Sequence, residues 1–173
     1  MRTEVNDRPL LLIDVDGVLN PHVAGGVTGP DRFAAHQIGG MRVHLSTGHG
    51  DWLRQLTALY ELVWVTTWEE AANALIGPVI GAPAGLPWIE FNDRDDLDWI
   101  WKLPAVERYA GNRPVAWLDD DPGQGADEWA ADRAAPTLLV KPQRELGWVE
   151  AEYDRLVAFA EGLTRQNPPT ART

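Results

Sequence analysis

Length, composition and charge already exclude several classes of protein. The chain has 173 residues, 45% of them hydrophobic, which suits a single domain with a sizeable core. Its formal net charge of −11 disfavours an extended nucleic-acid interface, because such surfaces are normally basic. The chain has no cysteine, so disulfides, thiolate metal sites and cysteine nucleophiles are excluded.

The N-terminal residues, MRTEVNDRPL, contain no apolar signal segment. No run of residues approaches the roughly 18 apolar positions that a membrane-spanning helix needs. We therefore expect a cytoplasmic protein that has no membrane partner.

The segment LLLIDVDGVLN at residues 10–20 joins an apolar run to two carboxylates. Leu10–Ile13 is typical of a strand that is buried on both faces of a parallel sheet. Asp14 and Asp16 follow this strand, and unpaired charge is costly at such a place unless a cation or a reaction uses it. Gly17 would allow the sharp turn that folds the second acid back over the first. Simple capping of the strand end is the alternative.

Glycine and proline dominate residues 21–40 and predict loops around a hairpin with arms at 34–38 and 41–45. An amphipathic helix is expected at 51–60, followed by a second buried strand at 62–65. This strand runs into Thr66 and Thr67, and a helix is predicted at 69–76. Either hydroxyl could bind an anion, or Thr67 could cap the helix.

A linker at 77–87 and a short third strand at 88–91 precede an acidic run at 92–98. The next predicted helix, 97–110, carries Lys102 among apolar residues. The presence of Pro104 indicates that this helix could begin later or be kinked. A fourth strand at 114–118 runs directly into Asp119, Asp120 and Asp121, which is unusual for an ordinary surface turn.

The closing elements are a helix at 127–134, a fifth strand at 136–141 and a helix at 148–163. Five apolar strands that alternate with helices predict an α/β fold with a parallel five-stranded sheet flanked by helices. Ligands of such sheets bind beyond the carboxyl ends of the strands, where Asp14, Thr66, Asp119 and Asp120 would gather. Residues 1–163 are expected to form one domain, and 164–173 a flexible tail.

The motif DVDGVLN resembles the first motif of the haloacid dehalogenase (HAD) superfamily of phosphotransferases. The resemblance implies a Rossmann-like fold, with Asp14 as the nucleophile that accepts a phosphoryl group and Asp16 as the general acid/base. It implies that Thr66, with Thr67 as the neighbouring candidate, binds the phosphoryl oxygens. About 30 residues between the motif and the next helix are too few for a folded cap domain, so we expect little or no cap.

The same resemblance implies a third motif, a lysine that pairs with the nucleophile. Lys102 is the best candidate, with Arg94 and Arg113 as alternatives, and a surface lysine lying alongside tryptophans is the other interpretation. It also implies a Mg²⁺ cofactor bound by Asp14, the backbone carbonyl of Asp16 and Asp120, with Asp119 as a direct or indirect ligand.

The expected function is a magnesium-dependent phosphatase that acts through an aspartyl-phosphate intermediate on a phosphorylated substrate of unknown class. Two alternatives remain open. One is a catalytically silent HAD-like binding or scaffold domain, and the other is a phosphatase of nucleic-acid ends, which fits an open site better than it fits the net charge. The sequence leaves the oligomeric state open.

Overall fold

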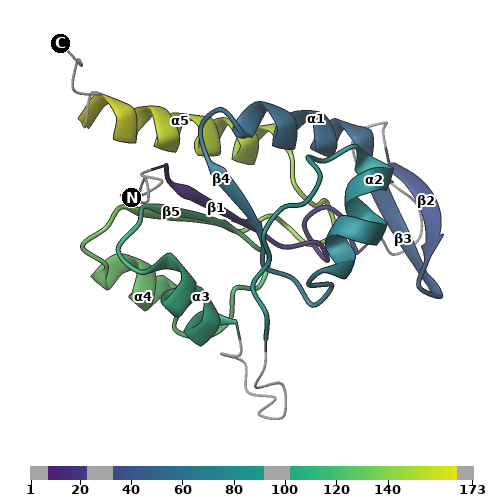
Figure 1. Ribbon diagram of the computed structural model, residues 1–173, viewed down its shortest axis with the longest axis horizontal. Helices are drawn as coiled ribbons and strands as arrows, with labels where there is room; N and C mark the ends of the chain where they lie inside the picture. Colours follow the sequence, from purple (N-terminus) through teal and green to yellow (C-terminus); the bar gives the residue numbers. More distant parts are fainter. Residues whose placement is uncertain (1–7, 23–32, 92–101, 167–173) are drawn as a thin grey trace, which may run out of the picture.

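The computed structural model describes residues 8–22, 33–91 and 102–166, which form an α/β structure (Figure 1). The parallel strands are β1 (Leu10–Ile13), β4 (Glu61–Trp64), β5 (Val115–Leu118) and β6 (Thr137–Val140). A separate hairpin consists of β2 (Phe33–Ile38) and β3 (Met41–Ser46). The helices are α1 (Thr47–Leu56), the π-helical turn η1 (Ala72–Ile76), α2 (Gly77–Ile80), α3 (Leu103–Ala110), α4 (Ala126–Asp132) and α5 (Glu150–Gln166).

The main sheet has the strand order β4-β1-β5-β6, and all its neighbouring strands are parallel. Ile13 lies level with Trp64 on one side and with Leu118 on the other, so β1, β4 and β5 end side by side. The chain crosses from β1 to β4 on one side and later returns to place β5 on the other. The loops that leave the carboxyl ends of β1 and β5 therefore run in opposite directions, and open α/β sheets bind ligands at such a place.

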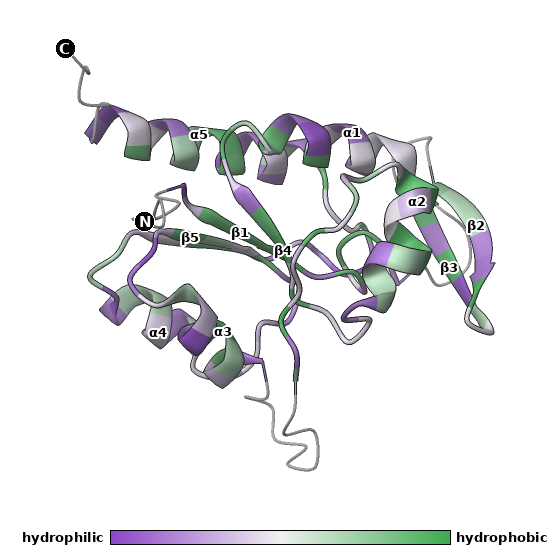
Figure 2. Cartoon of the chain, in the orientation of Figure 1, coloured by the Kyte–Doolittle hydropathy of each residue, from purple (hydrophilic) through white to green (hydrophobic). Residues whose placement is uncertain are grey.

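Alternate residues of β1 point into two separate hydrophobic clusters. Leu11 and Ile13 pack into the cluster that includes residues of α1 and α5, and Leu10 and Leu12 pack into the cluster that includes residues of α3 and α4. Figure 1 shows these helix pairs on opposite faces of the sheet, and Figure 2 shows hydrophobic residues along the strands between them. A strand covered on both faces must be apolar at every position, which explains the unbroken LLLI sequence.

The predicted third strand at 88–91 is wrong, and in the described part of the chain the sheet has four strands instead of five. Trp88 forms only an isolated bridge to Trp64 in β4. Beyond this bridge, the N–H of Phe91 donates to a carboxylate oxygen of Glu69 (3.0 Å). The acidic run at 92–98 lies outside the described residues.

The segment after β4 differs from the predicted helix and linker. Residues 66–70 form a bend and turns, and Glu69 has a φ of 47°, a left-handed conformation that interrupts a regular helix. The π-helical turn η1 follows, and α2 occupies the start of the predicted linker, with a proline in its first turn, where the missing N–H costs nothing.

The bounds of three helices differ from the predicted bounds. The helix α1 begins at Thr47, earlier than predicted, because the Ser46 hydroxyl accepts a hydrogen bond from the N–H of Gly48 (3.2 Å). Helix α3 begins only at Leu103, with Pro104 in its first turn, so Lys102 precedes the helix. The closing helix α5 extends to Gln166, beyond the predicted end at 163.

The predicted hairpin is confirmed, and its tip is a two-residue turn. Gly39 and Gly40 have φ values of 58° and 80°, as a type I′ turn requires. At its base, the N–H of His44 donates to the side-chain oxygen of Asn20 (2.8 Å), which ties β3 to the loop after β1.

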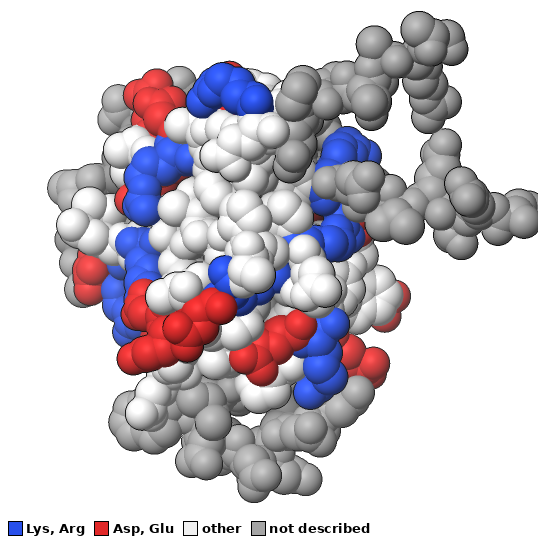
Figure 3. Space-filling view, turned by 90° about the vertical axis from the view of Figure 1, so that its left-hand side faces the viewer, with Lys and Arg blue, Asp and Glu red and all other residues white. Residues whose placement is uncertain are grey.

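The surface and the helices add two further facts. Figure 3 shows acidic and basic side chains mixed over the described part of one face, so that face does not form one basic surface. Among the described residues, no helix is both long and apolar enough to span a bilayer.

Candidate active site

Acidic and hydroxyl side chains follow three neighbouring strands. Because Ile13, Trp64 and Leu118 are in register, the residues after them lie level at one edge of the sheet. Asp14 follows β1, Thr66 lies two residues past β4, and Asp119 follows β5. The ladder continues through this point, since the N–H of Asp14 donates to the carbonyl of Leu118 (3.0 Å). The predicted gathering of these residues is therefore observed.

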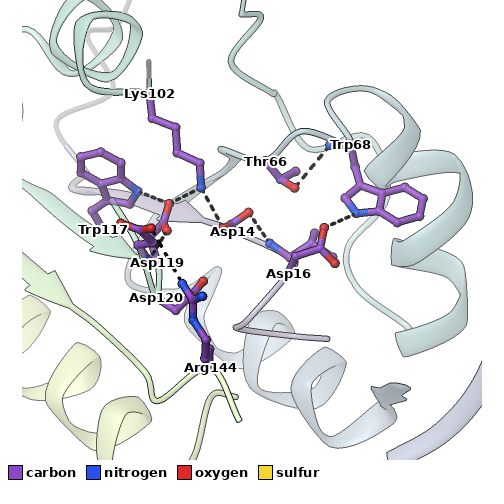
Figure 4. Close-up of polar contacts among 11 residues, drawn as sticks. Asp14, Asp16, Thr66, Trp68, Lys102, Trp117, Asp119, Asp120 and Arg144 are labelled. Carbon is purple, nitrogen blue, oxygen red and sulfur yellow. Dashed lines mark hydrogen bonds and ion pairs between the residues drawn. The ribbon is translucent and has the colours of Figure 1, made fainter. Parts of the chain in front are cut away.

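Lys102 lies between two of the carboxylates (Figure 4). Its Nζ is 2.8 Å from Oδ2 of Asp14 and 2.6 Å from Oδ2 of Asp119. The side chains of Lys102, Asp14 and Asp119 are 6%, 9% and 0% exposed, so this is a buried three-charge group. Burial alone would lower the pKa of Lys102, but the two carboxylates outweigh it and raise that pKa to about 12.

The other candidates for the third motif do not reach the site in the described structure. Arg113 pairs with Glu61 (2.8 Å), at the amino-terminal end of β4 and so at the opposite edge of the sheet. Arg94 lies outside the described residues. The alternative of a surface lysine is also wrong for Lys102, because its ammonium group is buried between carboxylates.

Asp119 is held on both oxygens. Its Oδ2 accepts from Lys102 and from the indole N–H of Trp117 (3.2 Å), and its Oδ1 accepts from the backbone N–H of Asp121 (2.9 Å). Burial and the nearby Asp14 carboxylate raise the pKa of Asp119 above its usual range, and Lys102 opposes this shift. Asp119 is therefore a fixed partner of Lys102, and its Oδ1 accepts only one of these hydrogen bonds.

Asp120 contacts Arg144, whereas Asp14 and Asp119 contact Lys102. Its Oδ2 lies 3.0 Å from the guanidinium of Arg144, and its side chain is 6% exposed. Burial and Asp14 raise the pKa of Asp120, against the effect of Arg144. Gly17 packs directly against this carboxylate with a φ of 79°, and a Cβ at that position would overlap the Asp120 side chain. Only glycine satisfies both conditions.

Asp14, Asp119 and Asp120 together could hold a metal ion. Each offers a carboxylate oxygen, and these oxygens lie within 4.8 Å of one another. Three carboxylates against Lys102 and Arg144 leave a local charge of about −1, which a bound cation would offset, since uncompensated buried charge is costly. Purely oxygen ligands suit Mg²⁺. The carboxylate of Asp16 is not in this group, and the contribution of its backbone carbonyl stays a prediction.

The carboxylate of Asp16 instead accepts two hydrogen bonds from neutral donors. The side-chain amide of Asn20 donates to Oδ1 (2.7 Å), and the indole of Trp68 donates to Oδ2 (2.9 Å; Figure 4). The neighbouring Asp14 accepts from the N–H of Val15 at Oδ1 (2.7 Å), which leaves its other oxygen to Lys102.

The two threonines after β4 differ in their surroundings. Thr66 is fully buried, and its hydroxyl accepts from the N–H of Trp68 (3.4 Å), whereas Thr67 is exposed. Thr66 is therefore the one held within the site, although its role toward a ligand stays a prediction.

Four residues that contact the site's carboxylates were not anticipated from the sequence: Asn20, Trp68, Trp117 and Arg144. Arg144 lies in the loop after β6, and a polar residue beyond the carboxyl end of a parallel strand was a usable signal. The indole contacts had no such signal, because tryptophans on strands and after them are more often core residues.

A scan of the chain against models of known protein families found no match, and a search among curated proteins found none either. What this site can do therefore follows from the chemistry of its own residues.

Proposed function

We propose that the protein is a magnesium-dependent phosphatase in which Asp14 accepts the phosphoryl group. The observation that carries this proposal is the buried group of Asp14, Lys102 and Asp119, with Asp120 alongside, at the carboxyl ends of β1 and β5. A simple structural ion pair needs one acid for one base, whereas this group contains a surplus of carboxylates. The order of these residues along the chain also resembles the HAD superfamily, and a Rossmann-like fold of that type is part of the proposal.

In the first step, a carboxylate oxygen of Asp14 attacks the phosphorus of the substrate. The bond from phosphorus to the leaving oxygen breaks. The leaving oxygen keeps the electron pair of that bond and accepts a proton from Asp16. Lys102 lies 2.8 Å from Asp14 and supplies positive charge next to the transferring group. Thr66 is the hydroxyl that we assign to the phosphoryl oxygens.

In the second step, the Asp16 carboxylate removes a proton from water as that water attacks the phosphorus held on Asp14. The bond between phosphorus and the Asp14 oxygen breaks, and the Asp14 carboxylate and inorganic phosphate are released. The proton that Asp16 gives up in the first step is thus returned from water in the second.

The residues that would hold Mg²⁺ are Asp14, Asp120 and the backbone carbonyl of Asp16. Asp119 would be a direct or an indirect ligand, because it lies in the same group of carboxylates and also pairs with Lys102. When bound, the ion supplies positive charge that offsets the negative oxygens of the phosphoryl group.

The test is magnesium-dependent phosphate release by the wild type and by Asp14→Asn. The panel contains an aryl phosphate, sugar phosphates, nucleotides, phosphopeptides and oligonucleotides with 3′ or 5′ phosphates. Asp51→Asn is the matched control, because the same chemical change is made on an exposed carboxylate of α1 that pairs with Arg54. We expect activity in the wild type and the control, and none in Asp14→Asn or with chelator.

Two outcomes would refute the proposal. Equal rates for the wild type and Asp14→Asn would mean that another nucleophile or a contaminant releases the phosphate. Binding of Mg²⁺ to the folded protein without turnover on any substrate would favour a silent binding domain. The best substrate in a positive panel would decide whether nucleic-acid ends are among the substrates.

A further inference from the structure

The carboxylate of Asp16 is fixed from two sides by residues that lie far apart in the sequence. Asn20 donates to one oxygen (2.7 Å) from the same loop, and Trp68 donates to the other (2.9 Å) from the turn after β4. Both donors are uncharged, so they orient the carboxylate without neutralising it.

The orientation of the Asn20 amide is itself determined. Its oxygen accepts from the backbone N–H of His44 in β3 (2.8 Å), and a backbone N–H can only donate. The NH₂ group must therefore face Asp16. Asn20 is only 9% exposed, so water competes little for these contacts.

Trp68 is presented to Asp16 by a strained turn. The N–H of Glu69 donates to the carbonyl of Thr66 (3.0 Å), and the N–H of Trp68 donates to the Thr66 hydroxyl (3.4 Å). Within the described ranges, Glu69 is the one residue other than glycine with a positive φ, at 47°. Its carboxylate accepts from the N–H of Phe91 (3.0 Å), which helps to hold this conformation. Strain of this kind is retained where the surrounding structure needs it, and clusters at functional sites.

From these contacts we infer that Trp68 is a positioning residue for the acid/base carboxylate, with Asn20 as the second donor. The inference rests on the proposed phosphatase function. A carboxyl group that protonates the leaving oxygen must stay at hydrogen-bonding distance from that oxygen in the transition state. The indole and the amide restrict rotation of the Asp16 carboxylate, and each of its oxygens keeps a further lone pair for proton transfer. Trp68 does not touch the reacting atoms in this scheme.

The hydrogen bond can be tested without any enzymatic assay. The chain contains nine tryptophans, so the ¹⁵N–¹H spectrum of the full-length protein should contain nine indole signals. Trp68→Phe identifies the Trp68 signal by its loss. Asp16→Ala should then shift that signal upfield and leave the signal of Trp52, in α1, unmoved. An unchanged Trp68 signal in Asp16→Ala would refute the contact.

The positioning role is tested by the dependence of rate on the leaving group. Aryl phosphates are compared from nitrophenyl, whose phenolate leaves without a proton, to phenyl, whose oxygen needs one. Trp68→Phe keeps an aromatic ring and removes the N–H, so it should lower turnover of phenyl phosphate about tenfold more than that of nitrophenyl phosphate, a part of the full effect of a general acid. Trp52→Phe is the matched control and should leave the ratio of the two rates unchanged.

Asn20→Leu removes the second donor at similar size and should change the same ratio in the same direction. This variant keeps the inference testable if Trp68→Phe folds poorly. An equal loss on every substrate would mean that these residues only support the fold, and would overturn the positioning role while leaving the phosphatase proposal intact. Activity that survives Asp14→Asn would instead refute the phosphatase proposal, and with it this role.

Discussion

Gly17→Ala should weaken the binding of Mg²⁺, and Gly40 in the hairpin supplies the control substitution. Gly17 and Gly40 have nearly the same φ, 79° and 80°. A Cβ on Gly17 would overlap the carboxylate of Asp120, whereas a Cβ on Gly40 would have no atom within 4 Å among those described. The two substitutions therefore share the backbone strain and differ only in the contact with Asp120.

The shared strain of an alanine at positive φ is about 1–2 kcal/mol, and the reduced entropy of the unfolded chain returns about 0.4–1 kcal/mol of that. This strain alone should therefore cost both variants about 1 kcal/mol of unfolding free energy. In Gly17→Ala the overlap is relieved by rotation of the Asp120 side chain, which breaks its 3.0 Å contact with Arg144 and removes a carboxylate from the metal-binding group. A 10- to 100-fold weaker affinity for Mg²⁺ is the order expected when the support of a metal site is lost, roughly as for mutated outer-shell partners.

Urea titration measures the first quantity and isothermal titration calorimetry with Mg²⁺ the second. We expect a lower urea midpoint for Gly17→Ala than for Gly40→Ala, because only Gly17→Ala also breaks the contact of Asp120 with Arg144. We expect a loss of Mg²⁺ affinity only in Gly17→Ala. If Gly17→Ala bound Mg²⁺ as tightly as Gly40→Ala, Asp120 would not be a ligand and the reasoning would be refuted.

Three further predictions concern the stability of the fold. Lys102→Met should reduce the unfolding free energy by about 3–5 kcal/mol, because buried carboxylates lose their counter-charge, and a loss below about 1 kcal/mol in urea titration would contradict the burial of this group. Burial lowers the pKa of His49 from 6.5 to about 4, against the effect of its hydrogen bond to the carbonyl of Trp148. As the pH falls, His49 therefore takes up a proton in the unfolded chain before it does so in the folded protein. The stabilisation that neutral His49 contributes is fully present above pH 6.5, and about 3 kcal/mol of unfolding free energy is lost between pH 6.5 and pH 4. His49→Gln should flatten the pH dependence of stability in this window, and an unchanged slope would show that His49 does not cause it. Gly50→Ala should lower the melting temperature, because its Cβ would overlap the backbone carbonyl of Ile80 and force α1 away from α2; an unchanged melting temperature would show that these helices are not in close contact.

The elements that the sequence predicted well are those whose pattern has a single physical explanation. The strands β1, β4 and β5 are apolar at nearly every position because helices cover both faces, and few other structures require that pattern. Carboxylates directly after two of these strands then had to meet, since parallel strands end at one edge. The contact of Lys102 with Asp14 and Asp119 follows this reasoning, although it came through a family resemblance and not from spacing.

The errors arose where a single side chain decided the backbone. The segment 88–91 is apolar enough for a strand, but Glu69 takes the N–H of Phe91 and pairing stops at Trp88. The left-handed conformation of Glu69 likewise replaces the start of the predicted helix with a turn, against the usual preference of glutamate, and the π-helical turn η1 forms the rest. The contact of Trp68 with Asp16 spans 52 residues, and no local pattern specifies a pairing at that distance.

The contact between His44 and Asn20 also limits how the hairpin could be redesigned. Backbone N–H groups of a strand alternate in direction, so a shift of β3 by one residue would turn the His44 N–H toward β2 and away from Asn20. Extension at the Gly39-Gly40 tip does not have this effect. Two residues added to each arm would preserve both the turn and the pairing at the base. The tip is therefore the place where the hairpin could be lengthened without disturbing the contacts that link His44, Asn20 and Asp16.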